Sequence, residues 1–460
     1  MRAAIQATCL LHAVLSQACG SGVTVRRTNQ AHDTARPAGI VALHESVEVA
    51  PVFGGPLYVL EAGPTNAAPL VLIHGLGERA ARDFDPLLAA LSQRFHVLAF
   101  DLPGFGRSSH ERNADYSPDR YIRAIHALIS SRFKAPVAVL GHSMGGALAI
   151  LYASSHPDWV ERLLLLDVAG IAETRGYIQE LLSLQLAGIG PRSSLLRSMS
   201  NALAAAAAAP LARMRLEHLD LSEDAKVQRS LSSEWLAALK FVRYDFSAAL
   251  HSLHAPTWIG WGTADSIAPL RTADALRYLL RPRAFLLFEA SAHVPMRSEP
   301  AAVLSATMGF LDSPLAPLPA ERPPPLTATR IGVCTNESDR VFQGDYASIE
   351  ISACRNTVLR DVRTRLLRIA ESTVELRHVD VLSDDVALHA HGARVQWTGG
   401  RIEAAVCFDL DGSRLDLMAV TCAAKGQPFR VQSASRVIAS ISTVQRAGRE
   451  TGLHGDFALR

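Results

Sequence analysis

Gly141-His142-Ser143-Met144-Gly145-Gly146 is the stretch that decides the fold of this chain. The apolar run Val137–Leu140 comes before it and predicts a buried strand, and the Ala- and Leu-rich run Ala147–Ala153 comes after it and predicts a helix. Glycines two positions before and after Ser143 let strand and helix approach closely through a sharp turn. Such a turn holds the Ser143 hydroxyl clear of the backbone and near the amides of a helix N-terminus.

A serine in this setting acts as a nucleophile when a histidine takes its proton and an acid orients the histidine. Asp265 follows the strand-like run Ala255–Gly262, and His293 follows the strand-like run Ala284–Phe288. Parallel strands bring such loops together at one edge of a sheet. The chain order of serine, acid and histidine therefore predicts a catalytic set at that edge.

Four segments together resemble the α/β-hydrolase superfamily, in its serine esterase, lipase and haloperoxidase-like branch. They are the serine turn, His74–Gly77, Asp101–Ser108, and the two loops that carry Asp265 and His293. The resemblance covers about residues 46–312. It implies an α/β-hydrolase sandwich with a mostly parallel sheet and a helical cap.

The resemblance also implies roles for five residues. Ser143 is expected to be the nucleophile, His293 the general base and Asp265 the acid that orients it. The backbone amides of Leu76 and Met144 are expected to form the oxyanion hole. The implied reaction is acyl transfer to water through an acyl-enzyme, and it needs no cofactor.

Other acidic and histidine residues offer alternatives. Asp167 ends the apolar run Leu163–Leu166 and is a second candidate for the acid, because some members of the superfamily carry the acid after that strand; Asp265 would then only cap a loop. His74, Asp101 and His142 are expected to be structural. The remaining histidines lack a spacing such as His-Glu-x-x-His, and no Gly-x-Gly-x-x-Gly follows a strand, so neither a metal nor a nucleotide cofactor is expected.

The segment between the strand-like runs that end at Leu166 and begin at Thr257 predicts the helical cap, at about residues 168–254. Its abundance of Leu and Ala favours an acyl chain or another apolar substrate, because burial of apolar surface drives binding. A helical insertion that packs only on itself is the alternative. The expected helices are Tyr177–Leu186, Ser193–Ala209, Glu223–Leu239 and Tyr244–Leu253.

The N-terminal residues predict an export signal or lipoprotein signal over residues 1–19, followed by a linker over residues 20–45. Arg2 supplies a positive charge, Ala3–Leu15 is mostly apolar, and small residues precede Cys19. Cys19 resembles the lipidated cysteine of bacterial lipoproteins, which would anchor the protein to a membrane. The expected location is therefore exported, either secreted, periplasmic or in the cell envelope. A short helix or an irregular start is the alternative, and it would leave the protein cytoplasmic.

A Pro-rich linker over residues 313–328 separates the hydrolase-like part from a β-rich domain over residues 329–460. Three of its β-type runs begin 20 or 21 residues apart, which favours a right-handed parallel β-helix; a small antiparallel sandwich is the alternative. The glycines at 392, 399, 400 and 412 are expected at the corners. The β-type runs are Ser348–Ile351, Thr373–Leu376, Arg394–Trp397 and Arg414–Leu417.

The β-rich domain holds four of the six cysteines, and their even number predicts two disulfides in an oxidising compartment. Three pairings are open, and reduced buried thiols are the alternative. Asp384-Asp385 and the pair Asp409 and Asp411 could bind calcium, but solvated turn acids are the favoured interpretation. The four cysteines are Cys334, Cys354, Cys407 and Cys422.

The composition of the chain limits the number of domains and the kinds of partner that we expect. The chain has 460 residues, 48% of them hydrophobic, which suggests two or three domains with substantial cores. Its net charge is only +2 and its basic residues are scattered, so no nucleic-acid partner is expected. The favoured function is an exported serine hydrolase that cleaves an apolar or lipid-like ester. The alternatives are a carbon–carbon bond hydrolase, a cofactor-free perhydrolase, and a non-catalytic surface protein that binds through its β-domain.

Overall fold

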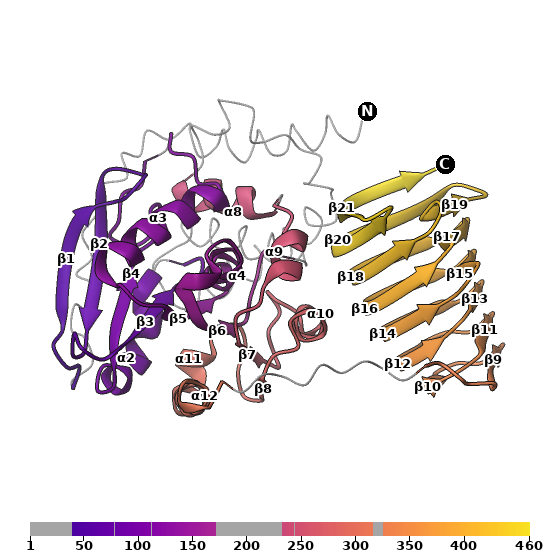
Figure 1. Cartoon of the computed structure of the whole chain (residues 1–460), viewed down its shortest axis with the longest axis horizontal. Helices are drawn as coiled ribbons and strands as arrows, with labels where there is room; N and C mark the ends of the chain where they lie inside the picture. Colours follow the sequence, from indigo (N-terminus) through magenta and orange to yellow (C-terminus); the bar gives the residue numbers. More distant parts are fainter. Residues whose placement is uncertain (1–38, 78, 112, 172–231, 243, 316–324) are drawn as a thin grey trace, which may run out of the picture.

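The computed structural model describes residues 39–77, 79–111, 113–171, 232–242, 244–315 and 325–460 (Figure 1). These residues form an α/β domain followed by an all-β domain, called here the β-domain. The predicted signal at residues 1–19, most of the linker at 20–45 and most of the predicted cap lie outside the described residues. Within the described ranges, no helix combines the length and apolarity needed to cross a bilayer.

An eight-stranded sheet forms the centre of the α/β domain, and it is mostly parallel, as predicted. Only β1 and β2 run antiparallel to their neighbours. The inner strands are apolar on both faces, which suits a parallel sheet covered by helices on each side. In sheet order the strands are β1 His44–Val49, β2 Pro56–Ala62, β4 Phe95–Phe100, β3 Ala68–Ile73, β5 Val137–His142, β6 Val160–Leu166, β7 Thr257–Gly262 and β8 Ala284–Phe288.

The first strand corrects one predicted boundary. β1 begins at His44, inside the segment predicted to be a linker up to residue 45. Four of its six residues are polar or charged, and its side chains are half-buried or exposed because it lies at the edge of the sheet. A polar edge strand resembles a linker in composition, and only its pairing with β2 identifies it.

Helices cover both faces of this sheet and bury a separate apolar cluster on each. The helices α3, α4, α8, α9 and α10 pack on one face, and η1, α2, α11 and α12 contribute to the other. The bounds are η1 Ala80–Phe84, α2 Asp85–Leu91, α3 Pro118–Arg132, α4 Met144–Ser155, η2 Pro157–Trp159, α8 Ser233–Val242, α9 Ser247–Ser252, α10 Leu270–Leu280, α11 Pro295–Ser298 and α12 Pro300–Asp312.

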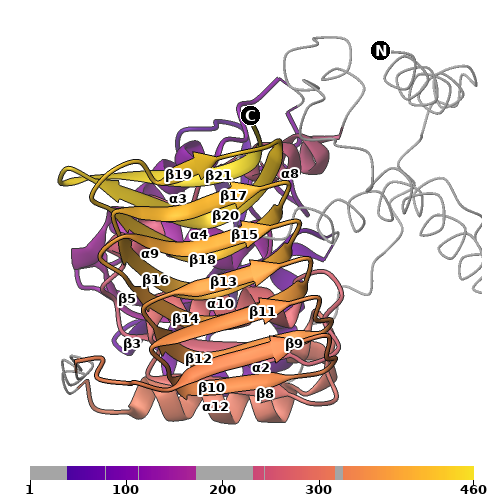
Figure 2. The same cartoon turned by 90° about the vertical axis from the view of Figure 1, so that its right-hand side faces the viewer.

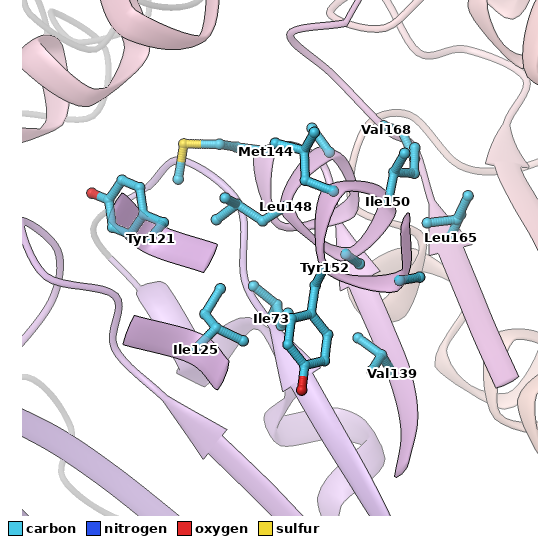
Figure 3. Close-up of a cluster of buried hydrophobic side chains, with 14 of the residues drawn as sticks. Ile73, Tyr121, Ile125, Val139, Met144, Leu148, Ile150, Tyr152, Leu165 and Val168 are labelled. Atoms are coloured by element: carbon cyan, nitrogen blue, oxygen red, sulfur yellow. The ribbon is translucent and has the colours of Figure 1, made fainter. Parts of the chain in front are cut away.

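The helix α4, which follows Ser143, lies at the centre of the larger cluster (Figure 3). Every residue from Met144 to Ala153 is buried, so this helix is apolar all round and is held by contacts on every side. Strands supply Ile73, Val139 and Leu165 to its surroundings, and α3 supplies Tyr121 and Ile125. The start of α4, next to Ser143, is therefore fixed in the core of the domain.

The β-domain consists of two sheets between which successive strands alternate (Figure 2). Neighbouring strands pair in parallel, apart from the last pair, so the antiparallel sandwich is wrong. The right-handed β-helix stays a prediction. One sheet contains β10 Val341–Asp345, β12 Thr357–Thr364, β14 Thr373–Leu382, β16 Arg394–Ala404, β18 Arg414–Ala424, β20 Ser435–Arg446 and β21 Arg449–Leu459; the other contains β19 Phe429–Val431, β17 Val406–Asp411, β15 Val386–His391, β13 Leu367–Ala370, β11 Ser348–Ser352 and β9 Ile331–Thr335.

The glycines of the β-domain have two different roles. Gly392 and Gly412 lie at turns between strands, as predicted, and both have positive φ. Gly399 and Gly400 were expected at a corner, and this expectation is wrong, because both lie inside β16. The strand bends at Gly399, which has a positive φ. Neighbouring strands bend at the residues opposite it in the register, and all of these residues also have positive φ. The residues at the bends are Asp361, His378, Gly399, Ala419 and Ile441.

The predicted disulfides are present, and their pairing is Cys334 with Cys354 and Cys407 with Cys422. The acidic residues considered for calcium at 409 and 411 are instead hydrogen-bonded to histidines of the neighbouring strand. The Oδ2 atoms of Asp409 and Asp411 lie 3.0 and 2.8 Å from the Nδ1 atoms of His389 and His391.

The two domains share a buried surface, where α9 and α10 face the bends of the larger β-sheet (Figure 1). Met418, Ala419 and Ile441 of the β-domain belong to the same apolar cluster as α4. Arg271 of α10 donates to Thr398 Oγ1 at 2.8 Å and to Asp416 Oδ1 at 3.0 Å.

Further along α10, Tyr278 donates to Asp380 Oδ1 at 3.1 Å and stacks on His378 with ring centroids 5.3 Å apart. The contact therefore combines apolar packing with oriented polar groups along the whole helix.

Substitution of Gly399 tests how closely α10 packs on the β-domain. A Cβ at Gly399 would lie 2.8 Å from both Tyr278 Cγ and His378 Cδ2, whereas at Gly412, which has a similar positive φ, the nearest atom would be Ser433 Oγ at 3.6 Å. We expect Gly399→Ala to lower the free energy of unfolding by about 2–4 kcal/mol, and Gly412→Ala by only about 1 kcal/mol through backbone strain. Urea denaturation measures both. Equal losses would show that α10 tolerates the added methyl group.

Candidate active site

Ser143 lies at a strained turn between β5 and α4. Its φ of 54° and ψ of −123° are unusual for a residue with a side chain. A Cβ at Gly145 would lie 2.1 Å from Ile73 O, and one at Gly141 would lie 2.4 Å from Gly145 O, so both positions require glycine. The Ser143 amide donates to Leu166 O at 2.9 Å, which ties the turn to the end of β6.

The structure brings the three predicted catalytic residues together from three different loops. His293 Nε2 lies 2.8 Å from Ser143 Oγ, and His293 Nδ1 lies 2.7 Å from Asp265 Oδ2. Asp265 follows β7 and is itself held by the amides of Ile267 and Ala268, which donate to Oδ1 at 2.8 and 3.0 Å. With Nδ1–H donating to the carboxylate, Nε2 accepts the hydroxyl proton of Ser143.

The loop after β3 lies directly against Ser143. A Cβ at Gly75 would be only 2.6 Å from Ser143 Cβ, so Leu76, the next residue, is close to the serine. His74 secures this loop, because its Nδ1 donates to Gly75 O at 2.7 Å and its Nε2 accepts from Leu102 N at 2.8 Å. Burial lowers the pKa of His74, so the ring is neutral and structural, in line with the prediction.

Asp101 holds the neighbouring Pro-Gly-Phe-Gly turn, as expected for a structural acid. It accepts from Ala81 N at 3.0 Å and from Arg107 N at 2.8 Å. A Cβ at Gly106 would lie 2.3 Å from Asp101 Oδ2, so the turn closes tightly around this carboxylate. These bonds fix the Asp101–Ser108 loop beside the His74 loop.

His142 precedes Ser143 and supports His293 through the backbone. Its Nε2 donates to His293 O at 2.6 Å, and the two rings lie 5.1 Å apart. Burial, together with the nearby His293, lowers the pKa of His142 to about 3. The His142 ring beside His293 is therefore neutral at pH values near 7. This agrees with the structural role expected for His142, whose partner the sequence did not indicate.

Asp167, the second candidate for the acid, lies beside Asp265 but does not hydrogen bond to His293. Its Oδ1 accepts from Gly262 N at 2.8 Å, and its Oδ2 is buried with no hydrogen-bond partner among the described residues other than the Asp265 carboxyl group. Asp167, Asp265 and His293 each have a possible metal-ligand atom, and these three atoms lie within 4.8 Å of one another. Such a set can hold a cation, but both ring nitrogens of His293 are already within hydrogen-bonding distance of Asp265 and Ser143.

The two carboxyl groups have opposite protonation tendencies. Burial raises the pKa of Asp167 well above its usual value, and the negative charge of Asp265 raises it further. Burial also acts upward on Asp265, but the hydrogen bond and charge of His293 outweigh it and lower the pKa of Asp265. Asp167 therefore holds the proton of this pair, and Asp265 holds the negative charge.

The protonated Asp167 makes stability depend on pH. Because the folded state keeps a proton that the unfolded chain releases above about pH 4, wild-type stability falls as pH rises towards the folded-state pKa of Asp167. We expect Asp167→Asn to remove this loss, so the variant gains about 1.4 kcal/mol per pH unit relative to wild type across that window. Urea denaturation between pH 4 and 8 measures the difference.

Asp265→Asn provides the opposite control. In wild type, the lowered pKa of Asp265 contributes stability at neutral pH, and this stability is lost as the pH falls through the folded-state pKa. Asp265→Asn should therefore be less stable than wild type at pH 7 and equally stable in acid. Parallel pH curves for wild type and Asp167→Asn would mean that Asp167 is ionised in the folded protein.

A family model and several known proteins match the α/β part of the chain. The model of the Alpha/beta hydrolase family matches residues 70–306, just over half of the chain. The chain is 29% identical over 260 residues to an uncharacterised protein of Mycobacterium tuberculosis, covering 53% of this chain and 75% of that one. It is 26% identical over 257 residues to Lipase 1 of Psychrobacter immobilis, covering 53% and 76%.

A third relative is the 2-hydroxy-6-oxo-6-(2'-aminophenyl)hexa-2,4-dienoic acid hydrolase of Metapseudomonas resinovorans, 24% identical over 257 residues, which cover 55% of this chain and 86% of that one. The matched family segment holds all four segments on which the resemblance was based, and it ends before the β-domain. The chain therefore belongs to the alpha/beta hydrolase family, and it is a hydrolase.

Proposed function

We propose that this chain hydrolyses carboxylic esters of apolar or lipid-like substrates through an acyl-enzyme on Ser143. The observation that carries the proposal is the unbroken hydrogen-bonded series from Ser143 through His293 to Asp265, with distances of 2.8 and 2.7 Å. A serine, a base and an orienting acid in this arrangement are the requirements for nucleophilic catalysis at neutral pH.

In the first step, Ser143 Oγ attacks the ester carbonyl carbon while His293 Nε2 takes the hydroxyl proton. Asp265 holds the ring in the required tautomer and stabilises the imidazolium that forms. The carbonyl oxygen becomes an oxyanion, and the proposed donors to it are the backbone amides of Leu76 and Met144. The imidazolium then gives its proton to the leaving alkoxide, and the C–O bond breaks to leave an acyl-enzyme.

In the second step, His293 Nε2 takes a proton from water as the water attacks the acyl carbonyl. The proton passes to Ser143 Oγ as the acyl bond breaks, which releases the carboxylic acid and restores the starting state. The neutral His142 beside His293 favours this cycle, because a second cation there would oppose formation of the imidazolium.

Two observations support the substrate class. The predicted cap at 168–254, most of which lies outside the described residues, is rich in Leu and Ala, and the relative Lipase 1 is named for lipid ester hydrolysis. The dienoic acid hydrolase among the relatives keeps carbon–carbon bond hydrolysis as the second candidate on the same residues.

We also propose that the protein is exported. The two disulfides support an oxidising compartment, because disulfides rarely persist in a reducing cytosol. A lipid on Cys19, a residue outside the described ranges, would then hold the protein at a membrane. Mass spectrometry of the intact protein from its native host tests both parts, since lipidation adds a defined mass and begins the mature chain at Cys19.

The nucleophile and the substrate class are tested together. Wild type should react with a fluorophosphonate probe and hydrolyse p-nitrophenyl esters with a preference for long acyl chains, while Ser143→Ala should do neither. His293→Ala should lose several orders of magnitude in turnover. Activity on acetate alone would contradict an apolar substrate, and absence of labelling in folded wild type would contradict a serine hydrolase.

The identity of the acid is tested by a matched pair of substitutions. Asp265→Asn should lower kcat by about 10⁴-fold, because it disturbs the tautomer of His293. Asp167→Asn replaces a protonated carboxyl with an isosteric neutral amide, so kcat should change by less than about tenfold. A larger loss for Asp167→Asn than for Asp265→Asn would assign the acid to the end of β6.

A further inference from the structure

The β-domain carries a groove of about 450 Å³ that crosses the beginnings of β12, β14, β16 and β18, and most of the residues that line it have polar or charged side chains. These strands are in the larger sheet, whose later bends pack on the α/β domain (Figure 1). Arg394 and Arg414 line the groove with Thr373, Gln396 and Asn356. All of its lining residues come from the β-domain, so the groove is separate from the site around Ser143.

Two arginines occupy neighbouring positions in this groove. Thr373, Arg394 and Arg414 are the first residues of β14, β16 and β18, and they lie directly opposite one another in the parallel register. Neighbouring strands are about 4.8 Å apart, so the two guanidinium groups start from adjacent positions on the same face. Like charges opposite each other destabilise a sheet unless something neutralises them.

Nothing in the described part of the chain neutralises these two arginines. The groove has two carboxylates, but Glu375 accepts from Arg377 at 2.6 Å and Asp416 accepts from Arg271 at 3.0 Å. Arg394 and Arg414 make no side-chain ion pair or hydrogen bond with any described residue, whereas Arg436, next in the same row, is paired with Asp456. The groove is thus left with two free positive charges.

The rest of the lining indicates the chemistry of a ligand. Asn356, Thr373 and Gln396 present amide and hydroxyl groups, which pair well with sugar hydroxyls. No aromatic side chain is among the described lining residues, so the groove has no platform for stacking bases of a nucleic acid. Its apolar lining residues are the buried or half-buried valines Val358, Val374 and Val395, so no lining residue presents an exposed apolar side chain for insertion into a membrane.

We propose that this groove binds an acidic polysaccharide, with Arg394 and Arg414 holding anionic groups of the sugar chain. Guanidinium groups bind carboxylate or sulfate oxygens in pairs of parallel hydrogen bonds. Asp416, at the edge of the groove, is bonded to Arg271 in the first turn of α10, and α10 follows the loop that carries Asp265. Binding here places the hydrolase site at a fixed position relative to the polymer.

The test uses the full chain with Ser143→Ala, so that binding is measured without any turnover. Fluorescence anisotropy follows the binding of a labelled galacturonic acid hexamer. Arg394→Gln with Arg414→Gln should weaken binding at least tenfold. Arg368→Gln with Arg430→Gln removes the same charge from the other sheet of the β-domain and should change affinity less than twofold.

A neutral glucose hexamer of the same length should bind at least tenfold more weakly than the acidic one, and added salt should weaken only the acidic ligand. Thermal melts verify that both double variants are folded. Equal losses in the two double variants, equal binding of the neutral hexamer, or no binding of the acidic hexamer would each overturn the proposal. The proposal would also be overturned if the protein bound phosphatidylglycerol vesicles through Arg394 and Arg414 but did not bind the acidic hexamer.

Discussion

The backbone turn at Ser143 is the constraint on which the rest of the active site depends. A residue with a side chain at positive φ costs on the order of 1–3 kcal/mol, and it persists only where its surroundings leave no alternative. Here the surroundings are the close backbone contacts at Gly141 and Gly145 and the bond from Ser143 N to Leu166 O. The buried residues Met144–Ala153 of α4 hold the other end of the turn, which keeps Ser143 Oγ within hydrogen-bonding distance of His293.

Of the three buried titratable groups His142, Asp167 and Asp265, which surround His293, only one carries a charge. His142 is neutral because it is buried, and Asp167 is kept protonated by burial and by its neighbour. Asp265 alone carries a negative charge, compensated by His293 and two backbone amides. A buried charge without partners is very costly, so this distribution satisfies stability and also provides the one carboxylate that the histidine requires.

The helix α10 connects this chemistry to the β-domain. Its N-terminal end follows the Asp265 loop, and its length packs on the bends of the larger β-sheet through Arg271 and Tyr278. Because residues of the β-domain are part of the buried cluster around α4, the two domains are not independent modules joined only by a linker. The stacked bends, where Gly399 avoids the Tyr278 ring, are what allow the helix to approach.

The sequence by itself determined the strand, turn and helix around Ser143, the order of the three loops, and the presence of a second β-rich domain. These features depend on local patterns and chain order, which are visible without coordinates. Polar β1 and the bend at Gly399 were misjudged, because an edge strand resembles a linker and a glycine in a strand resembles a corner. Only the tertiary structure decided that Asp265 rather than Asp167 contacts His293, that Cys334 pairs with Cys354, and that Arg394 lies opposite Arg414 in the sheet. Each of these depends on distances between segments far apart in the chain, which are set by sheet register and helix packing and which no local pattern encodes.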